Sequence, residues 1–396
     1  MSASTLKPTL TVLVAMSALQ PIALNLLAPA APALSRHFGS SYATIQLALT
    51  LFLVAVALTQ LVSGPLSDRF GRRPCVNAGI ALFIAGSALG ALAPSIEILL
   101  LARILEGAGS GSVFALSRAI IRDTANRDEA ASQIATVTMV MVIAPMIAPW
   151  LGGQIETAFG WRMILWFMTV SGVIVLLLTL VKLPETAPNL GERTPLLGVF
   201  RAFPTLIVNR VFVLNVIAVS TSSAAFFAFI AAAPYIVVET MGRGSDTYGA
   251  YFILNAAGYM VGNYAMARLV MKIGAPRMVH LGLVISSIAM TVAVPLSLRA
   301  DWSPIMLFLP LALNAIGNGM TIPGSTAEAL SARPDLAGSA AGLMGALQLG
   351  FSALMTVAIS LVVTIWPPSL VVLMWLLTII GMIAIHFGRR GAAARG

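Results

Sequence analysis

The chain has 396 residues, of which 59% are hydrophobic and only 9% are charged. Its mean hydropathy of +0.95 excludes an ordinary soluble domain, because about 25% of the residues in such domains are charged. Basic loops on one membrane face can account for the net charge of +9, so no nucleic-acid partner is predicted. A single cysteine, Cys75, excludes an intrachain disulfide, and three scattered histidines predict no metal site.

Long apolar runs recur along the chain, and a helix that crosses a bilayer needs about 20 such residues. Twelve runs are expected, near residues 9–34, 45–65, 76–94, 96–121, 131–153, 162–183, 210–238, 247–270, 276–298, 303–328, 336–363 and 368–388. The first is too long for a signal peptide and lacks a small-residue cleavage site, so it is interpreted as a span. The pattern predicts an all-α polytopic membrane protein with 12 transmembrane helices.

Basic residues divide unevenly between the two faces that this topology defines. With the N-terminus inside, most of the 23 Lys and Arg residues fall on the inner side. The outer side holds only Arg36, Arg162, Arg243 and Arg299, while Arg103 falls within a span. Because inner loops carry the excess of Lys and Arg, both termini are predicted to be cytoplasmic, in the inner membrane. The basic inner face is expected to contact anionic lipid.

A charged hairpin lies between the second and third predicted spans. Its polar and glycine positions are Gly64, Asp68, Arg69, Gly71, Arg72 and Arg73. Such a cluster cannot lie in hydrocarbon, so a tight loop at a membrane face is expected. Arg122 and Asp123, at the inner end of the fourth span, lie at the same level and suggest a charge relay with Asp68. The hairpin can act as a latch between moving parts, or its charges can serve only to set topology.

The fourth predicted span contains an arginine and a glutamate within the membrane. Arg103 and Glu106 are three residues apart, which places them on one face of a helix. Of the 14 acidic residues, only Glu106 lies well inside a predicted span. Burial favours the protonated form of a carboxyl, whereas a nearby arginine favours the charged form. A conformational change can therefore shift the carboxyl from one form to the other. Glu106 is therefore a candidate for proton coupling, and a fixed ion pair that holds the helices together remains the alternative.

Two prolines and two glycines mark the fifth predicted span, at Pro145, Pro149, Gly152 and Gly153. Prolines four residues apart remove two backbone donors and bend the helix, and the glycine pair allows another helix to approach. The segment is expected to be a hinge or a seal. A kink without a dynamic role is the alternative.

The longest predicted loop divides the spans six and six. It gives an N-terminal six-helix bundle at 1–183, a cytoplasmic linker at 184–209 and a C-terminal six-helix bundle at 210–396. The second half echoes the first at an offset of about 203 residues, where 271–277 match the hairpin loosely. Two related halves of this kind predict a transporter with its site between them.

Amides and aromatic rings within the spans are candidates for substrate contact, since such side chains suit an amphipathic organic ligand. The candidates are Asn25, Gln46, Asn215, Phe226, Phe227, Asn255, Tyr259, Asn314 and Gln348. The same residues can instead bond neighbouring helices or pack, so both interpretations stay open.

Three motifs resemble those of a known family. The hairpin 64–73 resembles the motif G-x-L-x-D-R-x-G-R-[KR] of the major facilitator superfamily. The fourth span, with Arg103-x-x-Glu106-Gly107, is similar to the R-x-x-Q-G motif of the same superfamily. Residues 144–153 resemble the motif A-P-x-x-A-P-x-x-G-G of its antiporters. Together they resemble the twelve-span drug:proton antiporters, in the bicyclomycin/chloramphenicol-resistance branch. The resemblance implies two pseudo-symmetric six-helix bundles that export small amphipathic compounds by alternating access. It also implies that protons are the coupling ion and that Arg103 helps to govern proton binding. A monomer without a cofactor is expected.

Two positions depart from this branch. Asn25 stands where the first span usually has an acid, and Glu106 stands where glutamine is usual. The protonatable carboxyl is therefore expected to have moved from the first span to the fourth, which favours neutral or anionic substrates. A proton-coupled exporter of a siderophore, amino acid or sugar and an uncoupled facilitator remain alternatives. No enzyme is predicted, because the spans contain no clustered acids, metal set or nucleophile–base pair.

Overall fold

A computed structural model describes residues 8–124, 144, 147–187, 203–333 and 336–393. Within these residues the regular structure is helical, and no strand is present. The first group of helices comprises α1 (Leu10–Leu26), the 3-10 turn η1 (Ala28–Ala30), α2 (Ala31–Phe38), α3 (Tyr42–Phe70), α4 (Arg72–Ala91), α5 (Ile96–Thr124), residues 147–159 and α7 (Trp161–Lys182). The second comprises α9 (Phe203–Val208), α10 (Arg210–Tyr235), the π-helix η2 (Ile236–Thr240), α11 (Ser245–Ile273), α12 (Ala275–Ser297), α13 (Pro304–Ser331), α14 (Ala337–Val362) and α15 (Ser369–Ala393).

Ten helical segments of the described chain are long and apolar enough to cross a membrane. They are Leu10–Phe38, Tyr42–Gly64, Arg72–Ala91, Ile96–Ile121, Trp161–Lys182, Arg210–Thr240, Ala275–Ser297, Pro304–Ser331, Gly342–Val362 and Ser369–His386. The predicted all-α membrane fold is confirmed. The eighth expected span corresponds to α11, a helix of 29 residues that contains two asparagines and is not among these ten. The fifth lies largely outside the described residues.

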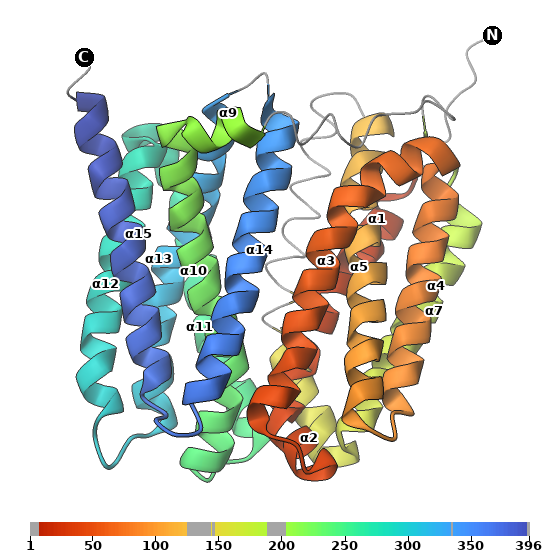
Figure 1. Cartoon of the computed structure of the whole chain (residues 1–396), viewed down its shortest axis with the longest axis horizontal. Helices are drawn as coiled ribbons and strands as arrows, with labels where there is room; N and C mark the ends of the chain where they lie inside the picture. The colour runs from red at the N-terminus through yellow and green to blue at the C-terminus, as the bar shows by residue number, and fades with distance from the viewer. Residues whose placement is uncertain (1–7, 125–143, 145–146, 188–202, 334–335, 394–396) are drawn as a thin grey trace. The chain divides into compact units, whose positions relative to one another are not determined.

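The chain forms two compact units. The first contains Met1–Ser40 and Leu47–Gly198, and the second contains Ser41–Gln46 and Val199–Gly396. In the first unit, α5 lies between α3 and α4 (Figure 1). A Cβ added at Gly109 would come within 2.4 Å of the Gly79 carbonyl oxygen on α4. On another side of α5, a Cβ at Gly107 would come within 2.5 Å of the Phe52 carbonyl oxygen on α3, so glycines let α5 touch both neighbours.

The second unit is packed in a related way around α10, the most deeply buried of the ten segments. Its helices α12 and α13 meet through glycines, because a Cβ at Gly282 would come within 2.6 Å of the Gly317 carbonyl oxygen. Gly79 on α4 and Gly282 on α12 are 203 residues apart in the chain. The close pair of helices α4 and α5 therefore has a counterpart in α12 and α13.

Candidate functional site

The predicted pair of Arg103 and Glu106 is buried inside the first unit. Arg103 is 1% exposed and Glu106 is fully buried. Nη1 of Arg103 forms an ion pair with Oε2 of Glu106. The hydroxyl of Ser87, on α4, donates a hydrogen bond of 2.6 Å to the other carboxylate oxygen. Both oxygens of Glu106 are therefore bonded, as a buried carboxylate requires.

Helices α1 and α3 hold the other side of the guanidinium. Nη2 of Arg103 donates to the Ala23 carbonyl oxygen at 3.2 Å, and its Cζ lies 4.4 Å from the centre of the Phe52 ring. A cation over a ring face is stabilised electrostatically, more so away from water. Neither partner carries a recognisable sequence signal, because a backbone carbonyl and an apolar ring look ordinary within an apolar span. The charge of Arg103 thus connects α1, α3 and α5.

Asn25 lies on the same helix as the Ala23 carbonyl and is 1% exposed. Its Nδ2 donates to the Pro21 carbonyl oxygen of its own helix at 2.8 Å. Its Oδ1 has no partner among the described residues. The described structure therefore shows no bond from this amide to a neighbouring helix, which was one of the two interpretations left open by the sequence.

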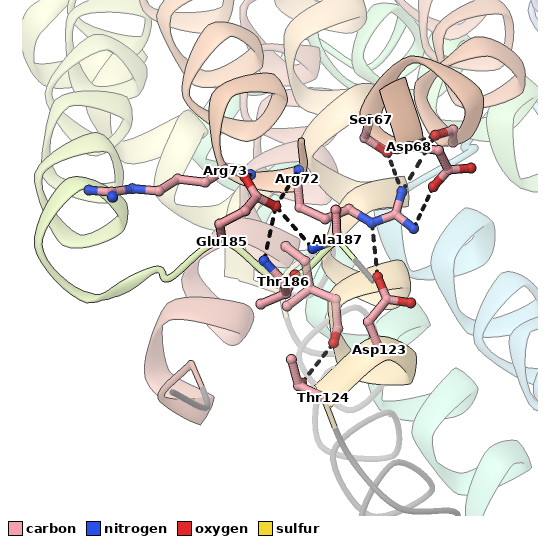
Figure 2. Close-up of polar contacts among 11 residues, drawn as sticks. Ser67, Asp68, Arg72, Arg73, Asp123, Thr124, Glu185, Thr186 and Ala187 are labelled. Carbon is pink, nitrogen blue, oxygen red and sulfur yellow. Dashed lines mark hydrogen bonds and ion pairs between the residues drawn. The ribbon is translucent and has the colours of Figure 1, made fainter. Parts of the chain in front are cut away.

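Where α3 ends and α4 begins, Arg72 connects two carboxylates (Figure 2). Its Nη2 lies 2.7 Å from Oδ1 of Asp68, and its Nε lies 2.9 Å from Oδ2 of Asp123. Arg72 is 3% exposed and its Nη1 also donates to the Ser67 hydroxyl. The structure thus brings together the acidic ends of the expected relay, with Arg72 between them.

Two other predicted latch residues make different contacts. Arg69 extends over the ring of Phe70, and Arg73 donates to the Leu180 carbonyl oxygen at 2.7 Å. The side chain of Arg122 lies outside the described residues. Nη1 of Arg72 donates to the Gly64 carbonyl oxygen at 3.4 Å, and a Cβ at Gly64 would meet no atom within 4 Å.

The expected loop at 64–74 is also corrected. Helix α3 continues to Phe70 and α4 begins at Arg72, so the connection is Gly71 alone. Its φ of +99° is a conformation that a residue with a Cβ rarely adopts. The charged residues are therefore part of the two helices and do not form a separate loop. A helix can continue past the end of its apolar segment because its backbone groups bond one another internally.

Glu185, just beyond α7, binds the start of α4 and was not singled out from the sequence. Its carboxylate accepts hydrogen bonds from the backbone N–H of Arg72 at 2.8 Å and of Arg73 at 3.2 Å (Figure 2). It also accepts from the N–H groups of Thr186 and Ala187. Burial by itself would raise the pKa of Glu185, but these four donors hold the pKa below its ordinary value.

Glu185 therefore caps α4 from a distant part of the chain. The residue before α4, Gly71, offers no side-chain cap, and a Cβ there would come within 2.6 Å of Oε2 of Glu185. The glycine thus leaves room for the carboxylate. The sequence feature that could have indicated this cap is an acid next to Pro184, immediately after the sixth predicted span.

The fifth-span motif is described only in part. Pro145 lies outside the described residues, while Pro149, Gly152 and Gly153 are buried within helical residues 147–159. A Cβ at Gly152 would come within 2.0 Å of the Leu26 carbonyl oxygen. Gly152 therefore packs directly against the end of α1, which also carries Asn25.

The substrate candidates of the second unit fall into different environments. Gln348 on α14 donates to the Ser223 hydroxyl on α10 at 2.7 Å, so this amide bonds a neighbouring helix. Asn215 donates to its own helix, at the Val211 carbonyl oxygen. Asn255 and Gln46 are each 5% exposed, and Tyr259 is half-buried.

Aromatic candidates in the second unit belong to a larger ring cluster. The centre of the Phe226 ring lies 5.7 Å from that of Phe227 and 6.5 Å from that of Phe252. Phe252 stacks on Phe229 with centres 5.6 Å apart, so part of the cluster is core. Asn314 is 2% exposed, and its Oδ1 has no partner among the described residues.

Comparisons with known proteins agree with this architecture. Residues 13–350 match the Major Facilitator Superfamily. The chain is 27% identical over 339 residues to the multidrug resistance protein MdtL of Shigella dysenteriae, covering 85% of this chain and 84% of that protein. It is 26% identical over 343 residues to a bicyclomycin resistance protein homolog of Haemophilus influenzae, covering 86% of this chain and 85% of that protein.

A crystal structure of a D-xylose-proton symporter has the same fold, with a TM-score of 0.77 at 18% identity, covering 96% of each chain. The family match spans most of the helices described above. The chain is therefore a multi-pass membrane transporter that belongs to the major facilitator superfamily.

Proposed function

We propose that this transporter exports small amphipathic organic compounds by alternating access and that proton entry drives the export. The observation that carries the proposal is the buried Arg103–Glu106 pair. The names of the relatives, a multidrug resistance protein and a bicyclomycin resistance homolog, support the substrate class. The transporter acts as a monomer in the inner membrane with both termini in the cytoplasm. It needs no cofactor beyond the coupling proton and performs no enzymatic reaction.

Glu106 is the proposed proton carrier. Among the described acidic residues it is the only one with 0% exposure. Protonation of Glu106 removes the negative partner of Arg103, and breaking one side of a buried ion pair costs about 3–5 kcal/mol. The site therefore accepts a proton only when the surroundings of Arg103 rearrange. Since Arg103 touches α1 and α3 as well, such a rearrangement moves helices.

The proton gradient is large enough for this task. One proton moving down 100 mV supplies about 2.3 kcal/mol, and a difference of one pH unit adds about 1.4 kcal/mol. The sum is comparable to the cost of opening the pair. One proton per cycle sustains a gradient of several hundred-fold for a neutral solute, since each 1.4 kcal/mol is a factor of about ten.

The relay of Asp68, Arg72 and Asp123 is the proposed latch at the cytoplasmic face, where the basic surface also contacts lipid. Gly152 supports a hinge or seal at 147–159, since it packs on the end of α1. With Asn25 uncharged, neutral or anionic solutes are the favoured substrates.

The test is solute-evoked proton flux with the purified protein in liposomes. Internal pH is recorded while a panel of neutral, anionic and cationic compounds, including candidate metabolites, is added. We expect flux in the wild type and none in Glu106→Gln. A matched control is Asp301→Asn, which removes the charge of an exposed ion pair with Arg299 and should leave the flux unchanged.

Other outcomes overturn parts of the proposal. Flux that survives in Glu106→Gln makes the pair structural. Solute movement without proton flux identifies an uncoupled facilitator. Flux evoked by a single metabolite and by none of the drugs identifies a dedicated metabolite exporter.

A further inference from the structure

The second oxygen of Glu106 is bonded to a serine of the neighbouring helix α4. Oε2 of Glu106 is paired with Arg103, and Oε1 accepts from the Ser87 hydroxyl at 2.6 Å. Ser87 and Glu106 are both 0% exposed. A carboxylate with one charged and one hydroxyl donor is held in a single orientation, because each oxygen points at its own partner.

A glycine beside the serine makes this contact possible. A Cβ at Gly86 would come within 2.7 Å of the Glu106 backbone nitrogen and 2.9 Å of the Ala102 carbonyl oxygen. The backbone of α4 therefore lies directly on that of α5 at this level. Such proximity places the short Ser87 side chain within reach of a carboxylate on the next helix.

The surroundings of Glu106 contain few other groups that respond to pH. Arg103, on α5 itself, is the only titratable or charged group that contacts Glu106 in the described part of the chain. Helix α4 contributes the Ser87 hydroxyl, while α1 and α3 contribute the Ala23 carbonyl oxygen and the Phe52 ring to Arg103. Ser87 is thus the one neutral side chain bonded directly to the carboxylate.

We propose that Ser87 is a positioning residue of the proton site and that its hydroxyl sets the pH range over which Glu106 binds and releases its proton. The proposal rests on the proposed function, in which Glu106 carries the coupling proton. A hydroxyl has one donor and two acceptor positions. It donates to the charged carboxylate, and after proton binding it rotates to accept from the new carboxyl O–H. The proton transferred comes from water and returns to water, and Ser87 itself neither gains nor loses one.

The direction of the effect follows from the charged state. The Ser87 hydroxyl can bond both forms of the carboxyl, but a hydrogen bond to a charged group is about twice as strong as one between neutral groups. It therefore favours the anion, and its removal favours proton binding. In Ser87→Ala, the alkaline limb of the pH profile for solute-evoked proton flux should therefore move upward by about one pH unit, a tenfold change in proton affinity. Ser87→Thr keeps a hydroxyl at this position and should restore a profile close to the wild type.

A second readout does not depend on transport. The infrared C=O stretch of a protonated carboxyl is titrated with pH, and subtraction of the Glu106→Gln spectrum isolates the band of Glu106. The midpoint in Ser87→Ala should lie above that of the wild type by the same amount as the flux profile. The control is Ser117→Ala, which removes an equally buried hydroxyl that bonds Ser17 and does not contact Glu106.

The outcomes separate this proposal from the proposed function. Equal midpoints in the wild type and Ser87→Ala, or an equal shift in Ser117→Ala, overturn the role of Ser87 even when the wild type couples protons to solute. If the wild type shows no solute-evoked flux, the proposed function falls, while the infrared midpoints still decide whether Ser87 tunes Glu106. If no band of Glu106 titrates while the protein stays folded, both are overturned.

Discussion

Removal of the carboxylate at position 185 tests how the start of α4 is held in place. Glu185 caps α4 through the N–H groups of Arg72 and Arg73. Glu185→Gln keeps one oxygen acceptor but loses the charge and places an NH2 group beside N–H donors. Glu185→Ala removes the cap entirely. Both changes should release the first turn of α4, which carries the arginine of the proposed latch.

The magnitude follows from the geometry of a helix start. Loss of a capping side chain costs about 1 kcal/mol in typical cases, and a negative charge at a helix N-terminus contributes about 0.3–1 kcal/mol. Because the Glu185 side chain is largely exposed, we take about 1 kcal/mol for either variant, allowing for solvent screening. Opening of this turn should then be about five-fold more frequent, since 1.36 kcal/mol corresponds to a factor of ten.

The single cysteine provides the assay. Cys75 is half-buried in the first turn of α4, so its rate of reaction with a pyridyl disulfide, divided by the thiolate fraction measured for each variant, reports local opening. Both variants should label about five-fold faster than the wild type at neutral pH, for the reason just given. Glu156→Gln, a change of another acid of the same unit, is the control. Equal rates for the wild type and both Glu185 variants would refute the capping role.

The pH dependence of the labelling rate tests the same contact in a second way. The pKa of Glu185 is lower in the folded protein than its ordinary value, so the cap is fully formed above about pH 4.3. Its contribution is lost as the pH falls through the folded pKa. The ratio of labelling rates between Glu185→Gln and the wild type should therefore approach one in acid. A ratio that grows in acid would contradict this reasoning.

Three further changes test other contacts. Gly152→Ala should lower the thermal stability of the protein, because the added methyl meets the α1 backbone and overpacking costs about 1–3 kcal/mol. Asp123→Asn weakens a hydrogen bond to the buried latch arginine, which is worth about 1.5–3 kcal/mol when the acceptor is charged, so transport and thermal stability should both fall. Asn25→Asp should restore part of the proton flux lost in Glu106→Gln, because Arg103 also contacts α1 and can serve an acid there.

Two of these changes have a matched control. Gly350→Ala places a methyl in open space on α14 and should not lower stability, because alanine is the better helix former. Asp301→Asn alters an exposed pair and should affect neither transport nor melting. If Asn25→Asp restores no flux to the Glu106→Gln protein, the idea that the carboxyl moved between spans loses its support.

Residues close together in the sequence determined much of the structure of this protein. The apolar runs set the positions of the helices, because a bilayer core accepts a backbone only when it bonds internally. Helix pitch alone placed Arg103 and Glu106 on one face, since residues three apart are neighbours on any α-helix. The charges at Asp68 and Arg72 likewise predict a position at a membrane face. The motifs that revealed the family depend on such short spacings.

Contacts between distant residues were decided by the tertiary structure. Ser87 reaches Glu106 only because Gly86 lets two helices touch, and Glu185 meets Gly71 across more than one hundred residues. A serine within an apolar span and an acid after its end have many equally ordinary uses, so neither signals its partner. Sequence spacing fixes geometry within one helix, whereas the choice of partner between helices depends on how close their backbones come, which only packing decides.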